Sequence, residues 1–87
     1  DELGSDQLTA NRVNWVSGVT PTKPFRAQAK IRYKAKAVDA WIEPLADDRV
    51  FIKFDEPLRD ITPGQAAVIY NGDVCLGGGT IERNEGA

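Results

Sequence analysis

The sequence predicts a small all-β fold, an antiparallel sandwich or barrel of roughly six short strands. β-prone runs alternate with turn signals about every ten residues, and no segment has the convincing 3.6-residue apolar period of an amphipathic helix. Three successive glycines, residues 77–79, lie inside the last run and permit a sharp bend. That bend favours a closed barrel over a sandwich.

The N-terminal part of the chain predicts a tail followed by one short strand. Residues 1–11 mix acids with small polar groups and show no strong period, so we expect no regular structure there. Residues 12–16, RVNWV, are β-prone and end at Ser17 and Gly18, before a loop that contains Pro21 and Pro24.

The clearest strand signal is the alternation over residues 25–33. One face carries Phe25, Ala27, Ala29, Ile31 and Tyr33, and the other carries Arg26, Gln28, Lys30 and Arg32. A side-chain period of two places the apolar set in the interior and the polar set outside. Two alanines on the inner face suit the tight interior of a small barrel.

Residues 38–45 and 49–55 predict a hairpin. Both runs are β-prone, and residues 46–48, Ala-Asp-Asp, supply the turn between them. Val50, Ile52 and Phe54 alternate on the inner face of the second run. Pro44 has no N–H to donate, so it indicates a strand end or an edge.

The C-terminal part predicts a crossover loop and a second hairpin. Residues 56–65 form the loop, in which Pro63 and Gly64 occupy the centre of a type II turn. Residues 66–70 and 74–81 flank Asn71-Gly72-Asp73, a strong short-range hairpin signal.

Composition restricts the class of protein and of chemistry. With 87 residues, 41% hydrophobic and 28% charged, the chain reads as one globular domain. We expect no membrane span or signal peptide, because every apolar run is only a few residues long. A single cysteine favours the cytoplasm. Because the chain has no histidine and only one cysteine, it cannot form a zinc site of Cys and His ligands or a catalytic triad that uses imidazole. We therefore expect no catalytic or metal-binding residues. The chain contains no methionine, so Asp1 is not a translation start and we expect a fragment of a longer protein.

Positive charge is concentrated in one segment. Residues 23–36 hold six cations and no acid, whereas the remaining chain holds five cations and thirteen acids. Alternate side chains on one strand face stand about 6.6 Å apart, so Arg26, Lys30, Arg32 and Lys34 form a linear array that suits a phosphate backbone. The alternative is a solvated face neutralised by acids on neighbouring strands, for which Asp39, Glu43 and Asp55 are available. The sequence leaves both readings open.

The remaining candidate sites favour structural roles. The triple glycine lacks the spacing and the lysine of a phosphate-binding loop. We expect Cys75 to be a buried, inert thiol, since no nearby basic residue stabilises its thiolate. Trp15 and Trp41 could stack on bases, but packing in the core or against another domain is the stronger expectation. The neighbouring acids lack metal-loop spacing and suit turns: Asp47, Asp48, Asp55 and Glu56.

An ordered series of motifs carries a family resemblance. The series comprises RVNWVSG at residues 12–18, TKPF at 22–25, KIRY at 30–33, TPGQA at 62–66 and CLGGG at 75–79. With these motifs the chain resembles, over residues 8–81, the C-terminal domain of the bacterial tRNA-specific 2-thiouridylase family. This MnmA/TrmU family is known in older naming as tRNA (5-methylaminomethyl-2-thiouridylate)-methyltransferase.

The resemblance implies an architecture for the longer protein. It implies a six-stranded β-barrel, similar to domain 2 of translation elongation factors, that follows a catalytic domain and a small central domain. Residues 1–11 would then end the central domain or link to it, residues 12–83 would form the barrel, and residues 84–87 would be a tail.

The resemblance also implies an activity. Enzymes of the family use ATP, with Mg, to adenylate the wobble uridine of certain tRNAs, and they replace its 2-oxygen with sulfur from a persulfide donor protein. The family's Ser-Gly-Gly-x-Asp-Ser motif and its two working cysteines lie in the upstream domains, and Cys75 matches neither cysteine. No catalytic residue and no cofactor site therefore carries over to this fragment.

A tRNA partner gives the basic segment a ligand. The expected contacts are Lys23, Arg26, Lys30, Arg32 and Lys34. The alternative is a structural module that docks on the catalytic and central domains without touching tRNA.

Overall fold

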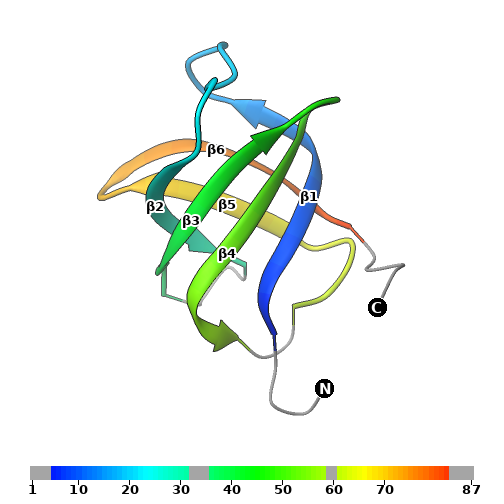
Figure 1. The fold of residues 1–87 in the computed structure, drawn as a ribbon, viewed down its shortest axis with the longest axis vertical. Coiled ribbons are helices and arrows are strands. Elements are labelled where there is room, and N and C mark those ends of the chain that lie inside the picture. The colour runs from blue at the N-terminus through cyan, green and yellow to red at the C-terminus, as the bar shows by residue number, and fades with distance from the viewer. Residues whose placement is uncertain (1–4, 32–35, 59–60, 83–87) are drawn as a thin grey trace.

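Six antiparallel strands form the fold. The structure, a computed structural model, describes residues 5–31, 36–58 and 61–82. The strands are β1 (Ser5–Trp15), β2 (Phe25–Lys30), β3 (Val38–Leu45), β4 (Arg49–Leu58), β5 (Ala66–Asn71) and β6 (Val74–Ile81). They close into a barrel in the order β1-β4-β3-β2-β5-β6, which confirms the predicted fold class (Figure 1).

β1 is much longer than predicted. The expectation of no regular structure before Arg12 is wrong for residues 5–11, which belong to β1; residues 7–10 pair with β4, and Asn11 pairs with β6. Leu8 and Ala10 point inward and are 7% and 0% exposed. Small polar residues separate them, and the apolar signal is too short to stand out from the sequence.

The other strands lie close to their predicted ranges. β3 and β6 agree with the predictions, and β4 extends three residues past Asp55. β2 ends at Lys30, before the predicted end at Tyr33. Ile31 is nevertheless buried as expected, whereas Tyr33 lies outside the described residues.

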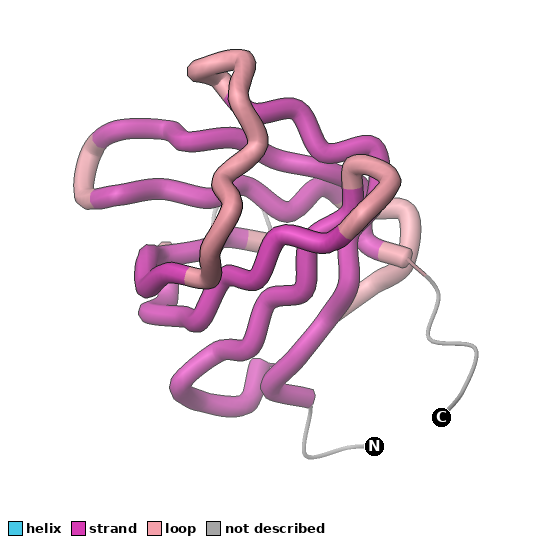
Figure 2. The backbone as a smooth tube through the Cα atoms, turned by 45° about the horizontal axis from the view of Figure 1, so that its top comes forward, coloured by secondary structure: helices cyan, strands magenta, loops and turns pink. Residues whose placement is uncertain are grey.

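The predicted turns are present, and the connections are drawn as loops in Figure 2. Asp47 and Asp48 take positive φ values of 62° and 58° between β3 and β4. Gly72, with φ 61°, closes the β5–β6 hairpin. Gly64 has φ 91°, and the Gln65 N–H donates to the Thr62 carbonyl at 3.2 Å, as a type II turn requires.

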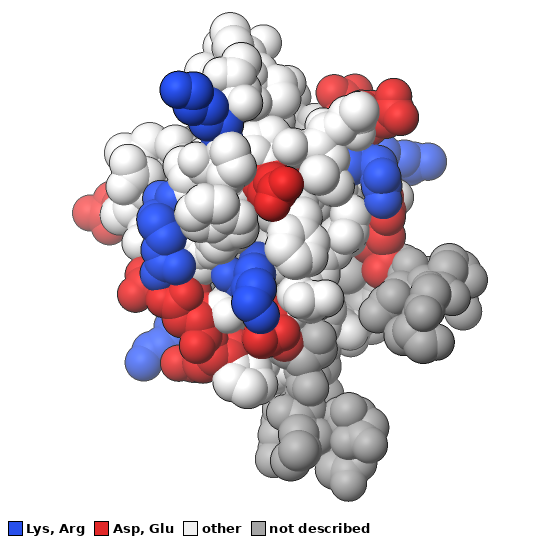
Figure 3. Space-filling model, viewed as in Figure 1, with Lys and Arg blue, Asp and Glu red and all other residues white. Residues whose placement is uncertain are grey.

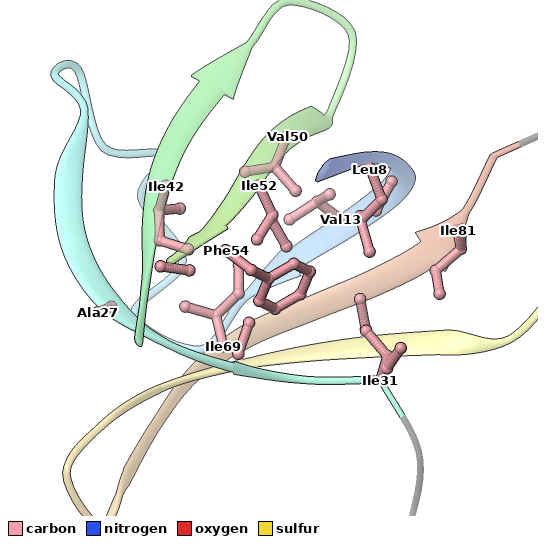
Figure 4. Close-up of a cluster of buried hydrophobic side chains, with 14 of the residues drawn as sticks. Leu8, Val13, Ala27, Ile31, Ile42, Val50, Ile52, Phe54, Ile69 and Ile81 are labelled. Atoms are coloured by element: carbon pink, nitrogen blue, oxygen red, sulfur yellow. The ribbon is translucent and has the colours of Figure 1, made fainter. Parts of the chain in front are cut away.

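The core fills the barrel interior. Ile42, Ile52 and Ile69 are each 0% exposed and converge from three strands (Figure 4). Ala27 and Ala29, 3% and 0% exposed, keep the β2 side of the interior narrow. The alternation seen in the sequence therefore sorts side chains into core and surface as predicted.

The triple glycine lets β6 approach both of its neighbours closely. A Cβ added to Gly77 would lie 2.5 Å from the Asn14 carbonyl oxygen, and one on Gly78 would lie 2.9 Å from that of Ala67. The β1–β6 register shifts between Asn11 and Asn14, so β1 carries a bulge beside the glycines of β6. Within the described residues, no helix is long and apolar enough to cross a membrane.

Candidate nucleic-acid interface

β2 projects its cations outward, as predicted. Ala27 and Ala29 face the core, so Arg26, Gln28 and Lys30 share the outer face of the strand. Lys23 lies exposed in the loop before β2. Two further predicted contacts, Arg32 and Lys34, lie outside the described residues. The structure thus places three of the five predicted residues, and these three lie on or just before one strand.

Arg26 is not free. Its Nη1 and Nη2 donate to Oδ1 and Oδ2 of Asp55 at 2.9 and 2.5 Å. The hydrogen bonds that Arg26 donates to Asp55 raise the pKa of the Arg26 guanidinium and lower the pKa of Asp55. For Arg26 the alternative of a cation neutralised by an acid on a neighbouring strand is therefore confirmed. Asp55 is one of the three acids that the sequence analysis named for this role.

Lys30 has an aromatic partner instead. Its Nζ lies 5.7 Å from the centroid of the Tyr70 ring on β5, at the distance of a cation–π contact. Among the described residues, no carboxylate lies within ion-pair distance of Lys30 or Lys23. These two ammonium groups keep the capacity to bind an anion.

Gln28 ties the basic strand to its neighbours. Its Nε2 donates to Oδ1 of Asp39 on β3 at 3.1 Å, and its Oε1 accepts the Gly72 N–H at 2.9 Å. One amide therefore joins β2, β3 and the β5–β6 turn. It fixes the backbone between Arg26 and Lys30.

Two further ion pairs on the surface were missed by the sequence reasoning. The Lys53 Nζ lies 2.7 Å from Oδ2 of Asp6, and the Arg49 Nε lies 2.8 Å from Oε2 of Glu82. Both pairs join residues more than 30 positions apart in the chain. Neither could be found from sequence because each depends on which strands become neighbours.

The two tryptophans have different environments. Trp15 is 8% exposed, and its ring centroid lies 6.3 Å from that of Phe25, so packing is confirmed for this residue. Trp41 is 40% exposed on the outer face of β3, so it does not pack in the core; packing against another domain, the other expectation for it, stays a prediction. It alternates with Ala40 and Ile42, which take the inner positions, and a side chain between them must face outward.

Cys75 is exposed, and the prediction of a buried thiol is wrong. The β5–β6 register shifts between Ile69 and Tyr70, and Cys75 lies beyond that shift, opposite Tyr70 and near the tip of the hairpin. The hairpin projects past the body of the barrel (Figure 1), so the side chain has no core to enter. The β-prone residues on either side of Cys75 predicted a strand but did not indicate that this side chain is exposed.

Charge is mixed over the face seen in Figure 3, where Lys and Arg side chains are interleaved with Asp and Glu. No group of three or more potential metal ligands gathers among the described residues. The space beside Gly77 and Gly78 is taken by neighbouring backbone, so the glycines do not form a cradle for phosphate.

Comparison with known proteins assigns the barrel to a family. Residues 5–81 match the family model described as the aminomethyltransferase β-barrel domain. The chain belongs to this family. The match covers all six strands, including the early part of β1.

The chain is also similar to curated proteins named tRNA-specific 2-thiouridylase. It is 52% identical over 83 residues to one from Thermoanaerobacter sp. (strain X514), and 52% identical over 81 residues to one from Geobacillus thermodenitrificans (strain NG80-2). These alignments cover 95% and 93% of the chain but 23% and 22% of the relatives. A relative from Picosynechococcus sp. is 46% identical over 87 residues, which are 100% of the chain and 25% of the relative. The chain therefore spans about a quarter of the length of these relatives.

Proposed function

We propose that this chain is the C-terminal barrel domain of a tRNA 2-thiouridylase and helps to hold tRNA on that enzyme. The activity for which the relatives are named and their greater length support the assignment. In the longer enzyme, ATP, Mg and the persulfide donor protein would act at the upstream domains, in the cytoplasm. Among the described residues no cluster of potential metal ligands is present, and backbone fills the space beside Gly77 and Gly78.

The tRNA contacts are assigned to the basic strand and its flanks. Lys23 and Lys30 carry the proposal, because among the described residues neither is paired with a carboxylate. Arg32 and Lys34 continue the same segment in sequence. Arg26 would contribute only by exchanging Asp55 for a phosphate, since that carboxylate already occupies its guanidinium.

The physical basis is release of counterions. Each phosphate that a lysine neutralises frees condensed cations, so affinity falls with salt and needs no base readout. Four cations are proposed to contact phosphates: Lys23, Lys30, Arg32 and Lys34. Each should therefore contribute about one neutralised phosphate to the slope of log affinity against log salt.

The test is binding of full-length enzyme to tRNA over a salt series, with Lys23→Gln and Lys30→Gln. Each change should reduce the slope of log affinity against log salt by roughly 0.7–0.9. Lys53→Gln is the matched control, because it removes the same charge from an outer-face lysine that is already paired with Asp6. Equal slopes for the Lys30 and Lys53 variants would reject the proposal.

The structural alternative has its own supporting observation. Several large apolar side chains remain exposed on the isolated barrel: Val16, Val19, Trp41 and Val74. Such groups are suited to contacts with other domains. Under this reading, removing the barrel would alter the folding or solubility of the enzyme, whereas the basic-strand variants would leave tRNA affinity unchanged.

A further inference from the structure

Trp41 lies on the outer face of the sheet, between cross-strand neighbours on β2 and β4. In the strand register, Arg26 on β2 lies opposite Trp41, and Lys53 on β4 lies opposite it on the other side. The indole Nε1–H donates to Oε1 of Glu43 at 3.4 Å. A side chain of this size, 40% exposed between two regular cross-strand neighbours, offers a broad apolar surface to a partner.

Ion pairs restrain both of the flanking cations. Asp55 holds Arg26 through two hydrogen bonds, and Asp6 holds Lys53 at 2.7 Å. Their side chains therefore lose part of their freedom before any partner arrives. Binding against such an ordered rim costs less side-chain entropy, and Trp and Arg are the residues most often dominant in protein interfaces.

The charge of this face argues against RNA. The Trp41 face consists of Trp41 with two cations and four carboxylates: Arg26, Lys53, Asp6, Asp39, Glu43 and Asp55. Two positive and four negative side chains give a net charge of −2. A phosphate backbone would be repelled here, whereas the basic side chains of a protein would be attracted.

The same charge argues against a second copy of the chain. A symmetric dimer would place this face against itself and bring two surfaces of like charge together. The carboxylates of Asp39 and Glu43 each have acceptor capacity left beyond the one bond they make in the described structure. The fitting partner is a protein surface with a slot for the indole and basic side chains around it.

We propose that the Trp41 face is where the barrel docks on another domain of its own polypeptide. This rests on the proposed function, in which the chain is one domain of a longer enzyme, since the relatives extend over about four times its length. The barrel then uses separate surfaces for its two partners. The Trp41 face binds protein, and Lys23 and Lys30 remain for tRNA.

Hydroxyl-radical footprinting of the full-length enzyme tests this proposal. The oxidation rates of Trp41 and Trp15 are read by mass spectrometry, and Trp15 serves as the internal control because it is buried in the barrel itself. We expect Trp41 to be protected without tRNA, nearly to the level of Trp15. The double variant Asp39→Lys, Glu43→Lys should expose Trp41 several-fold while leaving Trp15 protected.

Three contrary results would each overturn the proposal. Ready oxidation of Trp41 in the enzyme without tRNA would show that the face is open. Protection that appears only on adding tRNA would identify RNA, and protection lost on dilution would identify a second copy. The salt slope for tRNA is measured separately, so loss of this docking contact and loss of tRNA binding can be told apart.

Discussion

Arg26 on β2 reaches across the outer side of β3 to bind Asp55 on β4 with both guanidinium Nη atoms. β3 lies between the two strands, so the pair links next-nearest neighbours in the sheet. Its side chains are about half exposed, at 55% and 48%, so the pair adds little to stability and mainly fixes where the guanidinium points. A cation that seemed available for phosphate is thereby occupied.

Asp55→Asn should release Arg26 for phosphate. In the 87-residue chain, where no other domain covers the Trp41 face, we expect a tighter affinity for tRNA at low salt and a salt slope steeper by roughly 0.7–0.9. Asp39→Asn removes the same charge from the same face without breaking the bidentate pair, so it serves as the control. Equal salt slopes for the two variants would show that Asp55 does not keep Arg26 from binding phosphate.

Acid should destabilise the barrel through its ion pairs. Hydrogen bonds from Arg26 and Arg49 lower the pKa of Asp55 and Glu82. A carboxyl whose pKa is lower in the folded state stabilises the fold above its unfolded pKa, and this contribution disappears as the pH falls through the folded pKa. We expect the free energy of unfolding to be level above about pH 5 and to fall below about pH 4. Denaturant titrations over this range measure it, and Asp55→Asn should make the decline shallower; an equally steep decline in that variant would contradict this assignment.

The sequence predicted the parts of the fold that depend on local signals. Alternation around Ala27 and Ala29 defined β2, and Gly64 and Gly72 marked their turns because few other residues adopt those φ values readily. Leu8 was missed because its burial depends on pairing with β4, far along the chain. Local pattern does not contain that information.

The site was predicted less completely than the fold. The outward direction of Lys30 followed from the period of two, but its Tyr70 partner did not, because β2 and β5 become neighbours only when the barrel closes. Asp55 was recognised as one of several available acids, and only the three-dimensional arrangement selects it. For Trp41 the side-chain type suggested packing in the core or against another domain, and its position between two inward residues excludes the core.

Ile52→Ala should destabilise the barrel strongly. Ile52 is 0% exposed in the centre of the core, so truncation leaves a cavity and lowers the free energy of unfolding by about 2–5 kcal/mol. Val74→Ala, at a side chain that is 61% exposed, should change it by less than about 0.5 kcal/mol. Chemical denaturation of the two variants makes the comparison. Similar losses at both positions would be inconsistent with this core.

Gly77→Ala should destabilise through a clash. The new Cβ would lie 2.5 Å from the Asn14 carbonyl oxygen, so β1 or β6 must shift, and we expect a loss of about 1–3 kcal/mol. Gly18→Ala meets open space and suffers only from its φ of 83°, so about 1 kcal/mol is expected. Thermal unfolding separates the two effects. A tolerated alanine at Gly77 would mean that the strands are not in close contact there.

Cys75 should react with a thiol reagent in the folded protein. Its side chain is exposed on the hairpin, so labelling of the native chain should proceed within a few-fold of the rate in denaturant. The chain has a single cysteine, so absorbance of the released chromophore reports this site alone. Protection by orders of magnitude would restore the prediction of a buried thiol.

The most direct measurement is a map of the barrel's amide resonances during a titration of the ¹⁵N-labelled 87-residue chain with tRNA. We expect salt-sensitive shifts centred on Lys23 and on β2 around Lys30, with little change around Trp41 on β3. Shifts centred on Trp41 and β4, or no shifts at low salt, would contradict the claim that the free lysines of the basic segment contact tRNA.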